Sequence, residues 1–494
     1  MRVAIELQPQ FGAVDISAIK FNPKSRDDIP CVLRGLQQIY ITPNVRTAIF
    51  SVLEQEIAPK INKKNGRPGM ELWKILVLGV LRLELNCDYD RLLELANHHD
   101  TIRQMLGHSD VFDKSEYHMQ TVKENVGLLT EELLNKINEI VVTEGHLLIT
   151  KKSEGVVLHG RCDSFVVETN VHYPTDTNLL LDALRKSIFL SAVLCEEHGL
   201  SNLRQYQYNY RKLKQLQRIT QKSKRGGVEE KITVSHQEYI TQSTAELSKV
   251  TSALKELQAK PLSMLEILQI DAIKVYIKQA ETQIEQITRR VIEGESIPHA
   301  EKTFSIFEPH TEWISKGKAG IPVELGVRVC IIEDQYQFIL HHRVMEKETD
   351  DKVAVVMVKD SQAKFPLLNT VSFDKGFHSP ENQARLKELL TTAALPRKGK
   401  LSIAAKEIEN SPEFKSARKG HSAVESAING LEVHGLDFCP DHGIDGFKRY
   451  VALAILARNI HRIGAILHKK EQQALKRQQK TLNAANSSVI KQAA

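Results

Sequence analysis

The chain has 494 residues, which is too many for one ordinary domain, and its hydrophobic share of 41% is enough for a folded core. Its net charge of +6 permits a nucleic-acid partner without requiring one. The six cysteines form no CxxC pair and no Cys/His cluster at zinc spacing, which argues against a zinc finger and a disulfide-stapled secreted scaffold.

The first third of the chain is predicted to be helical, with helices near 45–57, from Glu71 onward and over 88–106. The most apolar window, 72–85, contains three charged residues and is shorter than the roughly 20 residues that a membrane span needs. We therefore expect a soluble, cytoplasmic protein with no membrane segment. Residues 1–65 are predicted to form an N-terminal helical segment and basic linker, and 66–150 a helical DNA-binding region. A plain solvated loop is the alternative for the linker.

The first stretch with the residue pattern of a β-strand is GVVLHGRCDSFVVETNVHYP, from Gly155. A second block follows at 323–334, 335–345 and 367–377, with predicted helices at 351–364, 380–390 and 417–431. Strands with interposed helices indicate an α/β domain with a mixed sheet over 151–468.

A long helical insertion, 190–300, interrupts this domain. Two heptad seams, one ending at Leu257 and one beginning at Ile273, predict a helical hairpin bent near Pro261. Ahead of them, RQYQYNYRKLKQLQRITQKSKRGG interleaves basic residues with tyrosines, which suits phosphate contacts and base stacking. The candidate DNA contacts in this run are Arg211, Lys212, Lys214 and Arg218. The alternative, a solvated helix face with tyrosines on its apolar side, is equally open.

The C-terminal part is predicted to contain an apolar helix over 447–467 and then a basic tail, 469–494. The tail lacks the apolar residues needed to fold alone, so we expect it to be frayed without a partner.

Three acidic residues are candidates for chemistry. Asp163 and Asp374 each lie at the end of a predicted strand, where loops of α/β sheets commonly carry active sites. Glu425 borders the apolar stripe of a predicted helix. Taken singly, each has an ordinary explanation, a strand or helix cap for the aspartates and a surface position for the glutamate.

Their order, strand Asp, strand Asp and helix Glu, resembles the DDE transposases of bacterial insertion sequences, close to the families grouped as ISNCY. The stretches that carry the resemblance are DSFVVETNVHYPTDTNLLLDAL, EWISKGKAGIPVELG, FDKGFHSPEN and HSAVESAINGLEVHGLDFCPDHGIDGFKRYVALAILARNIHRIG. The N-terminal GRPGMELWKILVLGVLRLELNCDYDRLLELANHH also looks like the helical region of such proteins. The resemblance covers most of the chain except 190–300 and the tail.

The resemblance implies a ribonuclease H-like mixed sheet with flanking helices, a helical N-terminal region and an inserted helical hairpin. It assigns Asp163, Asp374 and Glu425 as catalytic residues and as ligands of two Mg²⁺ ions, with Mn²⁺ as a substitute. The implied partners are transposon-end DNA, target DNA and a second copy of the chain, at the bacterial nucleoid. Relatives place basic residues four before and seven after the glutamate, where this chain has His421 and Glu432.

Further candidates for DNA contact are Lys375 and His421, near the acidic residues, and Lys316 and Lys318 in the WISKGKAG turn. Trp313 is a candidate for stacking on a displaced base. Solvated charge, and a core position for the tryptophan, are the alternatives.

Other functions remain open from sequence: a catalytically inactive, transposase-derived DNA-binding protein, a nuclease on the same fold, or a coiled-coil assembly protein dominated by 240–292. The chain has no Ser/His/Asp arrangement and no phosphate-cradling GxxxxGK[ST] loop, so a requirement for ATP is not implied.

Overall fold

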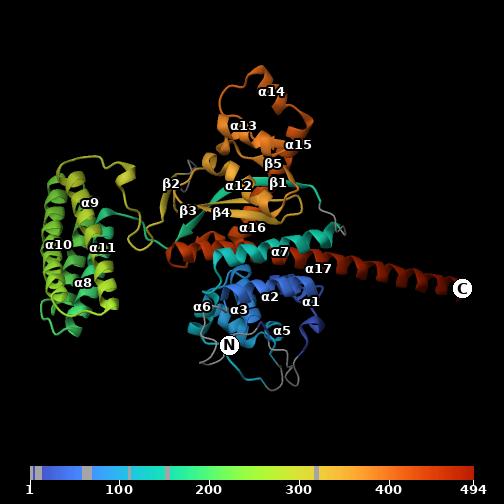
Figure 1. The fold of residues 1–494 in the computed structure, drawn as a ribbon, viewed down its shortest axis with the longest axis horizontal. Coiled ribbons are helices and arrows are strands. Elements are labelled where there is room, and N and C mark those ends of the chain that lie inside the picture. Colours follow the sequence, from blue (N-terminus) through green and yellow to red (C-terminus); the bar gives the residue numbers. More distant parts are fainter. Residues whose placement is uncertain are drawn as a thin grey trace. The chain divides into compact units, whose positions relative to one another are not determined.

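The computed structural model describes residues 4–5, 14–57, 69–108, 113–150, 156–315 and 322–493, without the side chains of 225–226 and 482–493. The chain forms two compact units (Figure 1). Unit 1 consists of Met1–Asn170 and Gly326–Ala494, and unit 2 of Val171–Leu325. Unit 2 is therefore an insertion in the sequence of unit 1, and it is longer than the expected 190–300.

Within its described residues the first third of the chain is helical, as predicted, with more helices than the three ranges expected. The helices are α1 (Asp28–Ile41), α2 (Pro43–Ile57), α3 (Leu72–Glu84), α4 (Tyr89–His98), α5 (Asp100–Met105), α6 (Met119–Val126) and α7 (Glu131–Thr150). The predicted helix 88–106 is broken because His99 caps α5, its Nδ1 accepting from the Ile102 N–H at 3.4 Å. The basic linker falls in 58–68, outside the described residues.

Helix α17 (Gly443–Ala493) is a long core helix that packs against α1, α3 and α7. Its fit against α1 is close, because a Cβ on Gly464 would collide with the backbone oxygen of Cys31. By length and composition the 443–481 part is apolar enough to cross a membrane, but 72% of its most apolar window is buried inside the protein. That degree of burial is typical of a core helix.

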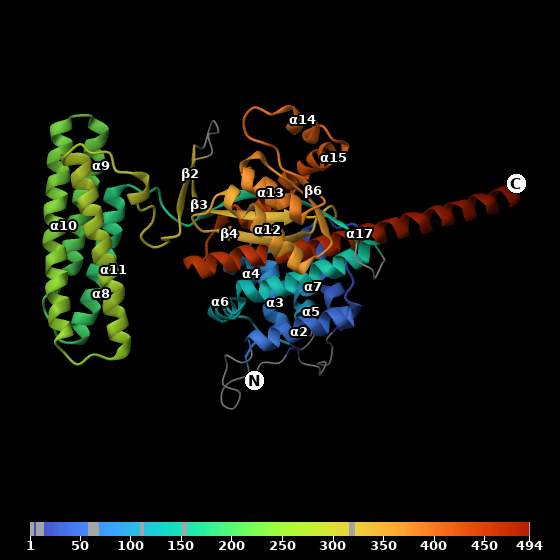
Figure 2. The same cartoon turned by 45° about the horizontal axis from the view of Figure 1, so that its top comes forward.

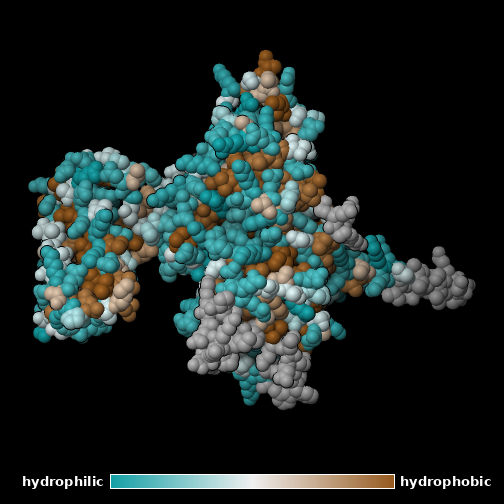
Figure 3. Space-filling view, in the orientation of Figure 1, coloured by the Kyte–Doolittle hydropathy of each residue, from teal (hydrophilic) through white to brown (hydrophobic). Residues whose placement is uncertain are grey.

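The expected fraying after Leu467 is wrong for the backbone, which stays helical to Ala493. Contacts with the first helices hold the beginning of this extension. Lys470 Nζ donates to the Leu148 oxygen at 2.6 Å, and Arg34 pairs with Glu471 at 2.7 Å. Between residues 473 and 481 the exposed side chains are polar or charged except for Ala474 and Leu475, and the coloured end of this helix is largely teal (Figure 3).

The sheet is mixed, as predicted. Its strands are β1 (Leu158–Thr169), β2 (Glu312–Ser315), β3 (Val323–Glu333), β4 (Ile339–Met345), β5 (Leu368–Phe373), β6 (Thr392–Ala394) and β7 (Phe438–Cys439). The order is β2-β3-β1-β5-β6, with β4 also paired to β3 and β7 to β1. β1 is antiparallel to β3 and parallel to β5, and β6 is parallel to β5. β1 is therefore a central strand with neighbours of both directions.

Helices flank the sheet of unit 1. They are α12 (Asp350–Lys364), α13 (Pro380–Leu389), α14 (Ile403–Glu409), α15 (Pro412–His421) and α16 (Ala423–Leu431). In Figures 1 and 2, α7 and α17 lie between the sheet and the other N-terminal helices, and α12 and α13 lie across the sheet from them. The single helix expected over 417–431 is two helices, because the chain breaks at Ser422.

The expected hairpin with its bend near Pro261 is present as the last two helices of unit 2, and two further helices, not predicted as part of it, complete a four-helix bundle. The helices are α8 (Asp176–Glu197), α9 (Tyr206–Gly226), α10 (Glu229–Gln258) and α11 (Met264–Ile287). The heptad seams lie on α10 and α11, and Val250, Leu254 and Ile273 are buried. The seams therefore pack within the chain, where α8 and α9 supply the rest of the core.

A buried ion pair joins α3 to the segment that precedes α17. The guanidinium of Arg82, only 4% exposed, donates to both Asp441 oxygens at 3.2 and 2.6 Å. Asp441→Ala leaves that charge buried without its partner, so the free energy of unfolding should fall by about 3–5 kcal/mol. Urea unfolding measures this loss. The exposed pair Glu381–Arg385 is the control, where Glu381→Ala should cost less than about 1 kcal/mol, and equal losses would contradict the prediction.

Candidate active site

Asp163 and Asp374 lie side by side on neighbouring parallel strands. The register of β1 and β5 pairs Cys162 with Phe373, so each aspartate is the next residue after a matched pair. Neighbouring strands are about 4.8 Å apart, and residues in register on parallel strands present their side chains to the same face. Asp374 is exposed just after β5 ends, as expected, whereas Asp163 is half-buried in the middle of β1 and not at a strand end, because the pairing with β3 continues to Glu168.

Glu425 comes to this place from a helix. It lies in the first turn of α16, whose buried residues Val424, Ala427 and Leu431 form the stripe that packs toward β1. Glu425 itself is exposed. Its carboxylate is close enough to Asp163 to act on the pKa of that residue. The charges of Asp374 and Glu425 therefore both act on Asp163, although no closer contact among the three is seen.

Burial and like charge raise the pKa of Asp163 to about 6. Burial contributes most, and the negative charges of Asp374, Asp350 and Glu425 add to it. A hydrogen bond from the Ser164 N–H, at 2.8 Å, opposes the shift because it stabilises the charged carboxylate. Asp163 is thus surrounded by carboxylates that repel its own charge.

Asp350 is the member of this group that sequence analysis missed. It begins α12, and its Oδ1 accepts a hydrogen bond from the Ser164 hydroxyl at 2.7 Å. Its Oδ2 would lie 3.0 Å from a Cβ on Gly376, so the turn after Asp374 passes close to it. In the sequence, the TDD that opens this helix looks like ordinary N-terminal capping, and it gives no separate signal for a site.

The donor set suits a hard divalent cation, since Mg²⁺ prefers carboxylate oxygens and would relieve the repulsion at Asp163. Asp163, Asp374 and Glu425 are the residues that would hold it, with Asp350 beside them. As placed, these side chains do not close on one point. Within the described part of the chain, no group of three or more His, Cys, Asp or Glu residues is positioned to hold a metal ion.

His421, the last residue of α15, is next to the acidic group. Its Nδ1 is 3.1 Å from the Ser372 hydroxyl on β5. Burial lowers the pKa of His421, and Arg418 and Arg161 lower it further against the opposing effect of Asp374 and Glu425. The imidazole is therefore mostly neutral at pH 7, so its part in phosphate contact would be a hydrogen bond and not a full positive charge. Lys375, next to Asp374, is exposed.

The other predicted DNA contacts belong to unit 2. Trp313 is half-buried on β2, and its ring lies 5.6 Å from that of Tyr173 and 5.8 Å from that of Phe304. It is therefore not a fully buried core residue. Lys316 and Lys318 lie outside the described residues.

Helix α9 carries the basic run. Arg211, Lys212, Lys214 and Arg218 are all exposed, while Leu213 and Leu216 are buried. The tyrosines divide: Tyr206 and Tyr210 pack against Phe189 with ring centroids at 5.0 and 5.3 Å, and Tyr208 is 63% exposed. Four charges and one tyrosine are thus accessible to a partner.

The raised pKa of Asp163 predicts a pH-dependent stability difference. The pKa of Asp163 is about 6 in the folded protein, against an ordinary value of 3.8. Protonated Asp163 therefore stabilises the fold fully below pH 3.8, and this stabilisation is lost as the pH rises through about 6. Without divalent cations, the free energy of unfolding of Asp163→Asn relative to that of the parent should therefore rise by about 1–1.5 kcal/mol between pH 5 and pH 8. Urea unfolding at both pH values measures it. The exposed Asp445→Asn should show no such change, and a constant gap for Asp163→Asn would refute the prediction.

No protein-family model, curated protein or solved structure matches this chain. Its function is therefore inferred from its own residues.

Proposed function

We propose that the chain is a DNA transposase of the DDE type, which cleaves the ends of an insertion sequence and joins the freed 3′-hydroxyl to target DNA. One observation carries the proposal. Asp163 and Asp374 each follow the matched pair Cys162–Phe373 of β1 and β5, and the charge of Glu425 on α16 acts on Asp163. The three residues are far apart in sequence: Asp163 is in the middle of β1, Asp374 just after β5, and Glu425 on α16.

The sheet supports the finer assignment to the ribonuclease H-like fold. Numbered in chain order within unit 1, the strands β1, β3, β4, β5 and β6 are the first to the fifth. Across the sheet they lie in the order β4-β3-β1-β5-β6. The second is antiparallel to the first, and the fourth is parallel to it. We infer the ribonuclease H-like fold from this mixed order, with Asp163 on the first strand and Asp374 just after the fourth.

The proposed chemistry divides between the protein and two Mg²⁺ ions, for which Mn²⁺ can substitute. When bound, the ions activate the attacking oxygen and stabilise the leaving oxygen. Asp163, Asp374 and Glu425 would hold them. The hydrogen bond from Ser164 to Asp350 fixes the start of α12 beside β1, and Lys375 supplies a positive charge next to Asp374 for a DNA phosphate.

DNA binding is assigned to the exposed basic face of α9. Arg211, Lys212, Lys214 and Arg218 are interspersed with buried Leu213 and Leu216, so they can contact phosphates without disturbing the bundle. Two transposon ends must be held together for joining, so a homodimer on DNA is part of the proposal.

The direct test uses the DNA that flanks the gene as the source of candidate ends. Purified protein with Mg²⁺ or Mn²⁺ should nick these ends and join them to a plasmid, and joined products are detected by sequencing across the junction. Cleavage without joining would assign the site to a nuclease. Binding without cleavage in either metal would leave only a DNA-binding protein, and both results would overturn the proposal.

Asp350 should tune the affinity for Mg²⁺. Asp350→Asn keeps an oxygen that can accept from Ser164 but removes one negative charge next to Asp163. The Mg²⁺ concentration for half-maximal cleavage should therefore rise about ten-fold, because the charge attracts the cation. A Mg²⁺ titration of cleavage measures it, with Asp351→Asn as the control one residue away. An unchanged requirement would mean that Asp350 serves only the start of the helix.

A further inference from the structure

A pocket of about 360 Å³ lies entirely within unit 2. Its walls come from the segment before α8, the ends of α9 and α11, the loop near residues 297–304, and β2. These elements are far apart in sequence and meet at one end of the bundle. The pocket contains none of the acidic residues of unit 1.

One side of the pocket is aromatic. Trp313 lies at 36° to Phe304 and at 67° to Tyr173, and His299 lies 5.2 Å from Phe304. Tyr173 is 62% exposed, and Trp313 and Phe304 are only half-buried. A ring cluster in a core would be covered on all sides. This one leaves ring surface open to the cavity.

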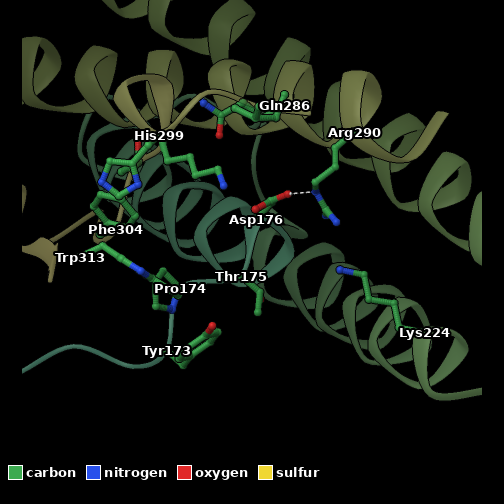
Figure 4. Close-up of a pocket in the computed structure, with 13 residues that line it drawn as sticks. Tyr173, Pro174, Thr175, Asp176, Lys224, Gln286, Arg290, His299, Phe304 and Trp313 are labelled. Carbon is green, nitrogen blue, oxygen red and sulfur yellow. Dashed lines mark hydrogen bonds and ion pairs between the residues drawn. The ribbon is translucent and has the colours of Figure 1, made fainter. Parts of the chain in front are cut away.

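The other side is basic. Figure 4 shows Lys224 and Arg290 across the pocket from Trp313 and Phe304, and Lys302 also lines it. Asp176 binds the Nε of Arg290 at 2.6 Å, which leaves the terminal guanidinium nitrogens available. Burial and the charge of Arg290 lower the pKa of Lys224, so the two cations repel each other in the absence of an anion. Three cations face one carboxylate here.

We propose that this pocket binds an unpaired nucleotide of a DNA strand, with its base against Trp313 and Phe304 and its phosphate near Lys224, Arg290 and Lys302. Every base has a face that can stack on an aromatic ring, and phosphate requires cations. A pocket with both kinds of wall matches both halves of a nucleotide, and its volume is in the range of small-ligand sites. The inference rests on the proposed function only for the choice of DNA.

Tryptophan fluorescence of the full chain tests this, because the chain has two tryptophans. Trp73 is fully buried in unit 1 and donates to the Met105 oxygen at 2.9 Å, so quenching by a bound base reports on Trp313. The probes are a short oligothymidylate, an abasic strand of the same length, and thymidine monophosphate. The buffer contains EDTA, so that the acidic residues of unit 1 are not required.

Oligothymidylate should quench the parent, and the abasic strand should not. W313F keeps a ring in place for the fold and should lose the quenching, and W313A should weaken binding of labelled oligothymidylate about ten-fold. The double variant K224Q/K302Q should weaken binding of both strands. Equal affinity of parent and W313A, or of thymidylate and abasic strands, would overturn the inference. Thymidine monophosphate that binds as tightly as the strand would also overturn it, in favour of a free nucleotide.

The outcome is separable from that of the catalytic proposal. D374N, which lacks one acidic residue of unit 1, should show the same quenching as the parent. If transposon ends are cleaved and joined while W313F and W313A behave like the parent, the pocket inference fails alone. If quenching follows the predicted pattern while no DNA is cleaved, only the catalytic proposal fails.

Discussion

Asp374→Asn is expected to abolish DNA cleavage and joining while DNA binding is retained. The substitution exchanges one exposed carboxylate for an amide of nearly the same size, so the sheet and the basic surfaces are unchanged. Metal ions lower the activation barrier by several kcal/mol, and losing that contribution in the variant corresponds to a cleavage rate lower by about a thousand-fold or more. Single-turnover cleavage in Mg²⁺ measures the rate, and a gel-shift titration measures binding.

The matched control is Asp445→Asn, which removes an exposed carboxylate from the first turn of α17 in the same unit. It changes net charge by the same amount, so its cleavage rate should equal that of the parent. Cleavage by Asp374→Asn within about ten-fold of the parent, a difference of only about 1.4 kcal/mol in barrier, would remove Asp374 from the catalytic group.

The second large effect concerns affinity for DNA. Replacing Arg211, Lys212, Lys214 and Arg218 by alanine together should weaken binding to any sequence, on the order of a hundred-fold at low salt. It should also reduce the slope of log affinity against log salt, by about 0.9 for each phosphate that the protein no longer neutralises. The four side chains are exposed and α9 keeps its buried leucines, so the bundle should remain folded. Fluorescence anisotropy at several salt concentrations measures both quantities.

The control uses four exposed lysines of the neighbouring helices α10 and α11, changed to alanine together: Lys231, Lys255, Lys274 and Lys278. This variant removes the same charge from the same unit. Weaker binding confined to the α9 variant would locate the DNA-binding face, whereas equally weak binding by both variants would show a general effect of charge. Unchanged binding by both variants would mean that the α9 face is only solvated.

The candidate site could be predicted from sequence because each acidic residue sits at a recognisable local feature. Asp374 follows a hydrophobic strand pattern and Glu425 borders a helical apolar stripe, whereas Asp163, expected at a strand end, lies in the middle of β1. Their convergence depends on the pairing of β1 with β5, which local patterns do not encode. Asp350 could not be predicted for the same reason, since its nearness to Ser164 arises only when α12 packs beside β1.

In the inserted unit 2, sequence patterns locate two of the helices but do not show which helices pack together. Heptad spacing locates the seams of α10 and α11, but the same apolar pattern fits a hairpin, a dimer or a bundle. The packing of α8 and α9 against these seams decides between them, and the local spacing of apolar residues does not encode that packing. The polar composition of the tail after Leu467 predicts fraying. Contacts from Lys470 to α7 and from Glu471 to α1 nevertheless hold the beginning of the tail as helix.

The central claim is that Asp163, Asp374 and Glu425 act together to cut and join DNA. Its most direct measurement is a strand-transfer assay with a pre-cut transposon end, whose free 3′-hydroxyl is offered to a supercoiled plasmid in Mg²⁺. The parent should join this end to the plasmid, and Asp163→Asn, Asp374→Asn and Glu425→Gln should each fail to do so while still binding the end. Joining by any of these variants at the parent's rate, with the same metal, would contradict the claim.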